Sequence, residues 1–449
     1  EGAGYLTFRA SAAYTGRAPM VYVGTNDGML NGFQASESGA NAGVEKVAYV
    51  PLASYQHLSK LTSPDYSHRF FVDGTAGFGD AYIDTGGGDA WHTVLVGTMA
   101  GGGRGVFALD ITAPGSFGTG KVLWDRAVID DPDLTLSDDG DLGYTYGQPS
   151  VVRMANGKWA AVLGNGYNSD NQRAALFILD LEDGSVMSKI DTGVGSASLP
   201  NGLSTPIPVD VDGDRITDAI YAGDMQGNLW KFDVSSGNAG SWAVAYGGTP
   251  LFVAKDPSNV RQPITARPEV TKHPVSGVVV LFGTGKYFEE VDRRLRSPEQ
   301  TQTFYGVYDD GAAVTGSRSA LLQQSVIATI AASDPANPSS ATANPVDVRV
   351  TTLLPPAAAQ KGWFLDLPAA GERQISRPVV RDQRVIFTTV IPNDSACSIG
   401  GTSWLMELDS VTGSRLPFSP FDLNGDNQFT VGDYVEIEVD GVLVRVPVS

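Results

Sequence analysis

The chain has 449 residues, more than one compact core usually takes, so it holds either several domains or a repeat architecture that grows by adding units. Its 53 glycines and 26 prolines make it rich in turns, yet a hydrophobic content of 42% excludes disorder. A net charge of −19 repels phosphate backbones, so nucleic acid is not an expected partner, whereas divalent cations are favoured.

Residues that build disulfide or zinc sites are few. Cys397 is the single cysteine, which excludes a disulfide scaffold and a thiolate zinc site, and four scattered histidines disfavour a zinc site of imidazoles. No run of about 18 apolar residues occurs, so no transmembrane segment is expected. The sequence begins at Glu1 without an initiator methionine or a signal peptide, and we therefore expect a fragment of a longer protein.

Strand signals follow one another along the chain, whereas helical periodicity is rare. Runs of β-branched or aromatic residues, most of them closed by glycine, predict strands at 20–23, 92–96, 159–163, 218–222, 278–282 and 385–390. The best helical candidate is short, at 317–332. Exposed loops are predicted at 331–345 and at the acidic run 130–141, where a further cation site is the alternative.

Six stretches repeat one pattern of strand, glycine turn, strand, aspartate, turn and glycine. The copies lie near Val21, Val94, Ala161, Ile220, Val280 and Trp404. Several copies are preceded by a proline where a strand should begin, at Pro149, Pro206, Pro268 and Pro378. A unit of about 60 residues with an inner strand and a hairpin suits a propeller blade. The sequence therefore predicts an all-β, modified β-propeller of about seven blades, six of them recognisable, as a single domain over residues 1–449.

Aromatic residues recur at or near one position of the repeat. They are predicted to fill the space between blades, with a sugar-binding role for any one of them as the alternative. The residues are Phe107, Trp230, Phe232 and Trp404.

The segment 210–218 has the spacing of a cation-binding loop. Oxygen-bearing side chains fall at its positions 1, 3, 5 and 9, glycine allows the sharp turn, and the carbonyl of position 7 is the expected backbone ligand. These residues are Asp210, Asp212, Asp214 and Asp218, with Ile216 at position 7. Four carboxylates within about 5 Å repel by roughly 3 kcal/mol per pair without a cation. Calcium is favoured over magnesium because many protein oxygens converge on flexible backbone.

A second loop, residues 422–433, follows the same start and closes at position 12. Its expected calcium ligands are Asp422, Asn424, Asp426, Gln428 through its carbonyl, and Asp433. This loop resembles the calcium loop of dockerin modules, and a plain Asn-Gly-Asp turn is the alternative.

No catalytic motif stands out, and no enzymatic activity is expected. The run Gly-Asn-Leu-Trp-Lys-Phe-Asp from Gly227 resembles the blades of pyrroloquinoline quinone propellers. Those enzymes stack their cofactor on a disulfide of adjacent cysteines, which one cysteine cannot supply.

Four motifs resemble the PilC/PilY family of type IV pilus biogenesis and tip adhesin proteins. They lie at 141–153, 163–169, 210–233 and 282–287. The resemblance covers most of the chain. It implies a C-terminal propeller of seven blades, with a calcium loop at Asp210–Asp218 whose occupancy governs pilus extension against retraction. It also implies a separate N-terminal region and a location outside the cell, at the pilus tip or on the outer membrane, after export through the periplasm of a Gram-negative bacterium.

These observations favour a calcium-dependent, non-enzymatic pilus assembly and tip factor that also takes part in surface adhesion. Minor pilins of the tip complex or the secretion machinery are the expected partners, with a host receptor or glycan as a further one. The alternative is an adhesin that binds a carbohydrate or host receptor and whose calcium is only structural.

Overall fold

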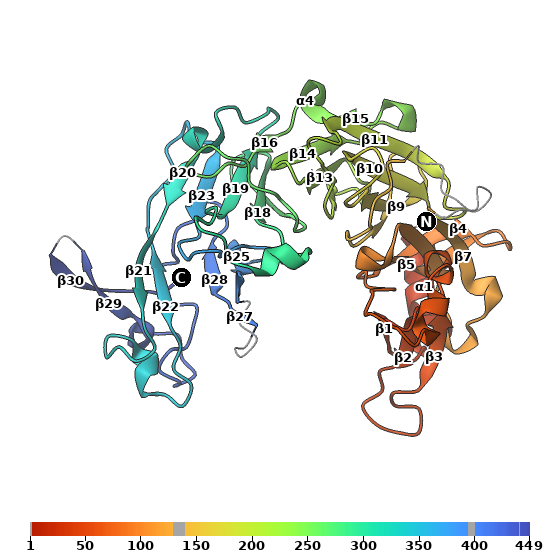
Figure 1. Cartoon of the computed structure of the whole chain (residues 1–449), viewed down its shortest axis with the longest axis horizontal. Coiled ribbons are helices and arrows are strands. Elements are labelled where there is room, and N and C mark those ends of the chain that lie inside the picture. The colour runs from red at the N-terminus through yellow and green to blue at the C-terminus, as the bar shows by residue number, and fades with distance from the viewer. Residues whose placement is uncertain (1, 129–139, 394–399, 440) are drawn as a thin grey trace. The chain divides into compact units, whose positions relative to one another are not determined.

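The computed structural model describes residues 2–128, 140–393, 400–439 and 441–449, and most of its regular structure is antiparallel sheet (Figure 1). Cys397 and most of the acidic run 130–141 lie outside these residues. The chain divides into two compact units, Glu1–Met225 with Trp230–Thr249 and Gln226–Leu229 with Pro250–Ser449. This division does not test the prediction of a single propeller domain.

The first unit contains four sheets and short helices (Figure 1). The helices are α1 (Gly2–Ala10), α2 (Ala12–Thr15), α3 (Leu52–Tyr55) and α4 (Ala245–Gly248). The first sheet has strands β1 (Met20–Gly24), β2 (Leu30–Gln34) and β3 (Glu45–Tyr49). The second has β4 (Gly77–Asp84), β5 (Asp89–Thr98), β6 (Gly105–Asp110) and β7 (Val122–Ala127). The third has β8 (Ser150–Arg153), β9 (Trp159–Gly164), β10 (Arg173–Asp180) and β11 (Val186–Gly195). The fourth has β12 (Ile207–Val209), β13 (Ala219–Gly223), β14 (Asn228–Asp233) and β15 (Ala243–Val244).

The second unit begins where β16 (Phe252–Val253) pairs with Asn228 and Leu229. The fifth sheet has β17 (Glu269–Lys272), β18 (Val278–Gly283), β19 (Thr303–Asp309), β23 (Gly362–Asp366) and β20 (Leu322–Gln324). The sixth has β24 (Val379–Arg381), β25 (Arg384–Thr388) and β28 (Leu405–Asp409). Three strand pairs complete the unit, namely β21 (Val326–Ile330) with β22 (Val348–Thr351), β26 (Ile391–Pro392) with β27 (Gly401–Thr402), and β29 (Val435–Val439) with β30 (Val442–Val446).

The repeat seen in the sequence corresponds to the sheets. Each of the six copies supplies two neighbouring strands of one sheet, in the pairs β1–β2, β5–β6, β9–β10, β13–β14, β18–β19 and β25–β28. Each marker proline directly precedes the first strand of a sheet, namely β8, β12, β17 and β24. The six predicted strands are all confirmed. The blade number of seven stays a prediction.

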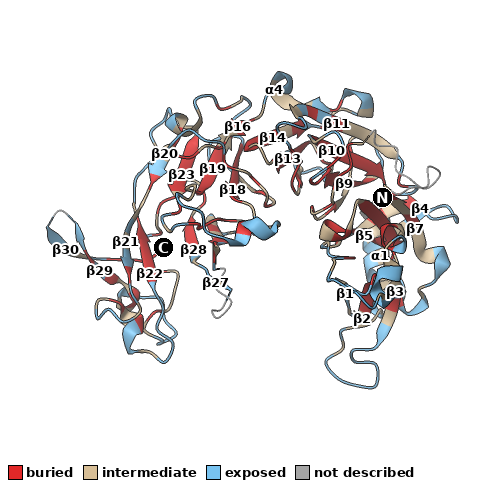
Figure 2. Ribbon diagram, in the orientation of Figure 1, coloured by how far each residue is buried: buried red, intermediate tan, exposed pale blue. Residues whose placement is uncertain are grey.

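Central strands are buried on both faces, which explains why they read as continuous apolar runs rather than as alternating ones. On β5, Val94 and Val96 pack into the core shared with the third sheet, while Leu95 between them faces the core shared with the first sheet. Figure 2 shows the same burial on β9, β10, β18 and β19. Consecutive sheets within a unit therefore share cores.

The closing glycine of the repeat packs against a tryptophan of a neighbouring sheet. Gly184 has φ +71°, and a Cβ atom there would lie 2.6 Å from the ring of Trp124. That indole donates a hydrogen bond to the carbonyl of Leu181 at 2.9 Å. The sixth repeat places Gly413 against Trp363 in the same way, with 2.2 Å between the added Cβ atom and the indole. The glycine thus supplies a left-handed turn and room for a neighbouring tryptophan.

The helix predicted at 317–332 is wrong. Only the turn η7 (Ser317–Ala320) is helical, and the rest forms β20 and β21. Burial alternates along β21 with a period of two, because Val326, Ala328 and Ile330 face one side of the strand pair while Ile327 and Thr329 face the other.

Most residues of the predicted loop 331–345 are exposed, as expected, and of the acidic run only residues 140 and 141 are described. Asn337 in the loop 331–345 is fully buried, and its amide donates to the carbonyls of Ala331 and Val346. Asp141, at the end of the acidic run, is 5% exposed and pairs with Lys189 at 2.7 Å. No helix among the described residues is long and apolar enough to cross a membrane.

Candidate metal centre

The first acidic loop connects the antiparallel strands β12 and β13. Val209 and Ala219 face each other in this pair, so the residues just beyond them, Asp210 and Asp218, are brought together by the strand register. The backbone N–H of Asp218 donates to the carbonyl of Val209 at 3.0 Å, which fixes the loop to the sheet. The strands therefore position both ends of the loop.

Carboxylates of the loop accept hydrogen bonds from its own backbone. Asp210 accepts from the N–H groups of Gly213 at 2.6 Å and Arg215 at 2.7 Å, and Asp212 accepts from that of Asp214 at 3.1 Å. Positive φ angles at Gly213 and Arg215 curl the chain so that these contacts form. The loop thereby turns several carboxylates to its concave side.

Three carboxylates converge. Oxygen atoms of Asp210, Asp212 and Asp218 lie within 4.8 Å of one another, and among the described residues no other group of three or more acidic, histidine or cysteine side chains does so. Asp214 is not in the group, and its Oδ1 accepts from the N–H of Ile216 at 2.7 Å. Oxygen donors at this spacing suit a hard cation such as calcium.

The pKa of Asp210 lies below its ordinary value. Partial desolvation acts to raise it, but hydrogen bonds from the N–H groups of Arg215 and Gly213 outweigh this by stabilising the charged form. Asp210 is therefore ionised at neutral pH, as a calcium ligand must be.

The second loop repeats the hydrogen-bond register of the first. Asp422 accepts from the N–H groups of Gly425 and Asn427, both at 2.8 Å, and these two residues have positive φ. Asn424 Oδ1 accepts from the N–H of Asp426 at 2.9 Å, and Asp426 Oδ1 from that of Gln428 at 2.8 Å. Because these hydrogen bonds join equivalent positions in both loops, the two loops can be compared position by position.

The closing acids differ between the loops. Asp218 accepts one backbone hydrogen bond, from Val211. Asp433 is fully buried and accepts from the N–H groups of Leu423, Asn424 and Thr430. Asp433 thus serves as a hydrogen-bond acceptor for three groups of its loop, whereas Asp218 lies in one carboxylate group with Asp210 and Asp212.

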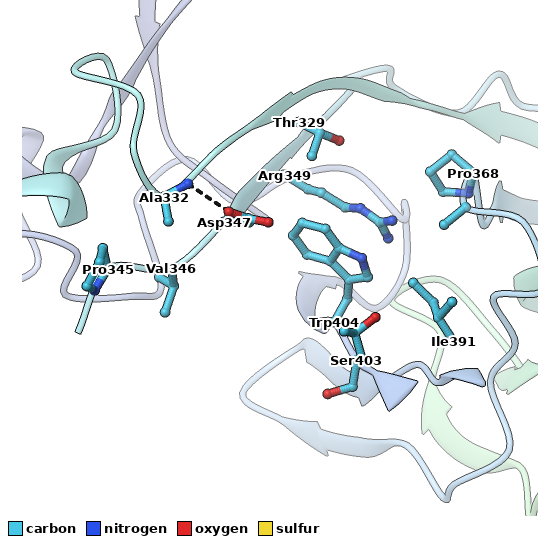
Figure 3. Close-up of a pocket in the computed structure, with 12 residues that line it drawn as sticks. Thr329, Ala332, Pro345, Val346, Asp347, Arg349, Pro368, Ile391, Ser403 and Trp404 are labelled. Atoms are coloured by element: carbon cyan, nitrogen blue, oxygen red, sulfur yellow. Dashed lines mark hydrogen bonds between the residues drawn. The ribbon is translucent and has the colours of Figure 1, made fainter. Parts of the chain in front are cut away.

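All four predicted inter-blade aromatics contact a core between sheets, but Trp404 only packs against the edge of one. Phe107, Trp230 and Phe232 are buried in cores, as predicted. Trp404 is only half-buried and lines a cavity of about 740 Å³ in the second unit (Figure 3). The sequence gives no sign of the residues that support it, Arg349 and Glu372, because they lie far away along the chain.

Six sheets built from one repeat, with an oxygen-rich loop between two strands, define an all-β repeat protein of the propeller class. The family model described as the PilY1 beta-propeller domain matches residues 1–331 of this chain. A crystal structure of the Pseudomonas aeruginosa PilY1 C-terminal domain superposes with a TM-score of 0.80 at 34% identity, covering 99% of this chain and 88% of that one. The chain belongs to the PilY1 β-propeller family.

Curated relatives are longer than this chain. It is 40% identical over 457 residues to the type IV pilus biogenesis factor PilY1 of Pseudomonas aeruginosa strain PAO1, covering 93% of this chain and 37% of that protein. It is 38% identical over 430 residues to a PilY1 homolog of Xylella fastidiosa strain Temecula1, covering 91% and 27% respectively. The chain thus spans well under half the length of the relatives it matches.

Proposed function

We propose that this chain is the propeller region of a calcium-dependent, non-enzymatic type IV pilus assembly and tip factor at the cell surface. Relatives named as pilus biogenesis factors support the assembly role. The observation that carries the calcium part is the convergence of Asp210, Asp212 and Asp218 within 4.8 Å. Asp214 and the carbonyl of Ile216 are the proposed remaining ligands of this site.

Bound calcium neutralises the gathered carboxylates and fixes the β12–β13 loop. The ordered loop then shapes a surface for minor pilins or the secretion machinery, which favours pilus extension. Loss of calcium leaves like charges facing one another, loosens the loop and favours retraction.

A second calcium ion is proposed at Asp422, Asn424, Asp426, the carbonyl of Gln428, and Asp433. Its role is structural, because this loop packs on a core. Leu423 within it is 4% exposed and contacts the apolar residues of β22 and β29.

The proposal is tested in the native bacterium by Asp212→Asn in the full-length protein. Asp212 uses one oxygen as an acceptor, so asparagine can keep that bond and removes only the charge. We expect fewer extended pili and reduced twitching. The matched control is Asp233→Asn, an exposed aspartate at the end of β14 that also caps a backbone turn. Wild-type pilus number and twitching with Asp212→Asn, in a protein shown to have lost calcium, contradict the regulatory role.

The alternative, an adhesin with purely structural calcium, is favoured by the half-buried Trp404 beside a cavity. In that case Asp212→Asn lowers protein stability and adhesion together, while surviving protein supports normal pilus dynamics.

A further inference from the structure

Trp404 is held on two sides by one buried ion pair. The guanidinium of Arg349 stacks on the indole with its Cζ 3.9 Å from the ring centroid. Arg349 in turn forms a bidentate pair with Glu372, at 2.7 and 2.9 Å, and the two side chains are 3% and 0% exposed. The cation–π contact fixes one face of the ring.

The backbone of Trp404 is tied to the same carboxylate. Its N–H donates to Thr389 Oγ1 at 3.3 Å, and that hydroxyl donates to Glu372 Oε1 at 2.8 Å. The N–H of Thr389 donates to the carbonyl of Trp404 at 2.9 Å. Burying an ion pair costs desolvation energy and adds little stability by itself. Here it immobilises a half-exposed aromatic ring, which is the arrangement that a ligand platform needs.

The space around this platform is large and mixed in character. A cavity of about 740 Å³ and an adjoining one of about 600 Å³ share Val346, Asp347, Arg349, Ser403 and Trp404. Figure 3 shows the first of them, with the Trp404 ring among side chains that come from β21, β22 and the segment before β28. Together the cavities form one groove, named here the Trp404 groove, large enough for a ligand of two sugar rings.

Polar groups surround the ring. The exposed hydroxyls of Thr329, Thr402 and Ser403 line the groove, as does the exposed carboxylate of Asp347. One oxygen of Asp347 accepts from the N–H of Ala332 at 2.7 Å, which orients the carboxylate. Hydroxyls both donate and accept hydrogen bonds, and a carboxylate accepts several. A pyranose matches this set, since its C–H face packs on an indole and its rim carries hydroxyls.

Charge narrows the ligand class. Among the described residues that line the groove, the cation is Arg349, which is neutralised by Glu372, whereas Asp347 leaves an exposed carboxylate beside the ring. An anionic sugar would meet like charges without a compensating cation. We propose that the Trp404 groove binds a neutral saccharide, with one sugar ring stacked on Trp404 and its hydroxyls bonded to Asp347 and the neighbouring hydroxyls.

The test is an array of neutral, sialylated and sulfated glycans probed with the 449-residue chain in calcium-containing buffer. Titration with the bound neutral glycan follows for each variant. Trp404→Ala should weaken binding by about tenfold or more, because the stacking surface is lost. Trp404→Phe keeps a ring for Arg349 and should bind within a few-fold of wild type. Asp347→Asn should weaken binding while retaining an acceptor for Ala332. The control Phe78→Ala removes an aromatic side chain that is 76% exposed in the other unit, and it should bind as wild type.

Three results overturn the inference, namely no neutral glycan bound by the wild type, equal affinity of a folded Trp404→Ala variant, or binding of sialylated or sulfated glycans in place of neutral ones. Thermal unfolding of each variant shows that it is folded. If Trp404→Ala does not fold, Trp404→Phe and Asp347→Asn decide the question through their opposite expected effects. The inference rests on the adhesin alternative to the proposed function, and these variants leave the loop 210–218 intact. A failed glycan test therefore leaves the pilus assembly role unaffected.

Discussion

The carboxylate of Asp218 accepts a hydrogen bond from the backbone N–H of Val211 at 2.7 Å, seven residues earlier in the chain. This contact closes the loop between β12 and β13 from its far end. Asp433 makes the equivalent contact to the N–H of Leu423 in the second loop, ten residues earlier. The two loops therefore begin with the same hydrogen-bond geometry, but the closing acid stands at position 9 in the first and at position 12 in the second.

The closing acids should differ in their importance for stability without calcium. Asp433→Ala removes the buried acceptor of three backbone N–H groups, and we expect a loss of about 3 kcal/mol in the free energy of unfolding. Asp218→Ala removes one acceptor, and we expect a loss of about 1 kcal/mol. Urea unfolding in chelator measures both. Equal losses would show that Asp433 is not the structural acid of its loop.

Calcium should raise the unfolding temperature of the chain. A ligand at 100 times its Kd stabilises the folded state by about 2.7 kcal/mol, provided that it binds only that state. Asp212→Asn should lose the part due to the first loop, and Asp233→Asn should retain the whole effect. Differential scanning calorimetry with calcium and with chelator provides the comparison. The same calcium shift in Asp212→Asn as in wild type would remove this loop from the account.

Glycine at the end of the repeat should be irreplaceable where a tryptophan packs on it. Gly184→Ala combines positive φ with a clash against Trp124, for an expected loss of about 3 kcal/mol. Gly157 also has positive φ, +86°, but no atom lies within 4 Å of an added Cβ. Gly157→Ala should therefore cost only about 1 kcal/mol. Similar losses in denaturant unfolding would mean that the tryptophan contact is unimportant.

Asp125 lies between the first and second sheets. Its carboxyl group should make the free energy of unfolding depend on pH. Burial raises its pKa to about 6, although hydrogen bonds from the Tyr49 hydroxyl and the Leu52 N–H act to lower it. Both bonds end on Oδ2, so a proton on the other oxygen breaks neither. The folded state binds this proton more tightly than the unfolded state, whose reference pKa is 3.8. The stabilisation of the folded state by this proton is complete below about pH 4 and is lost as pH rises to about 6. The free energy of unfolding falls by as much as about 3 kcal/mol over this range.

Asp125→Asn provides the measurement, since asparagine cannot titrate and its single carbonyl oxygen can accept both bonds. The difference in unfolding free energy between wild type and this variant should fall as pH rises from 4 to 6. A difference that rises over this range would reverse the sign of the assignment.

Much of the fold was predictable because its signals are local. Strands buried on both faces read as apolar runs, and a proline precedes the first strand of four sheets. The acidic loops are equally local, since the spacing of Asp210, Asp212 and Asp218 is enough to define one curled turn.

The Trp404 groove could not be predicted for the opposite reason. Its ring is supported by Arg349, Glu372 and Thr389, which three different segments contribute and which share no spacing pattern. The helix expected at 317–332 failed because strand pairing with β22 and β23 overrides the weak helical period of that stretch.

Isothermal titration calorimetry of the metal-free chain measures calcium binding by the two loops directly. We expect two ions to bind the wild type. Asp212→Asn should remove the ion of the first loop, Asp426→Asn that of the second, and Asp233→Asn neither. No calcium-dependent heat in the wild type, or an unchanged titration with Asp212→Asn, would contradict the central claim that the loop between β12 and β13 is a calcium site.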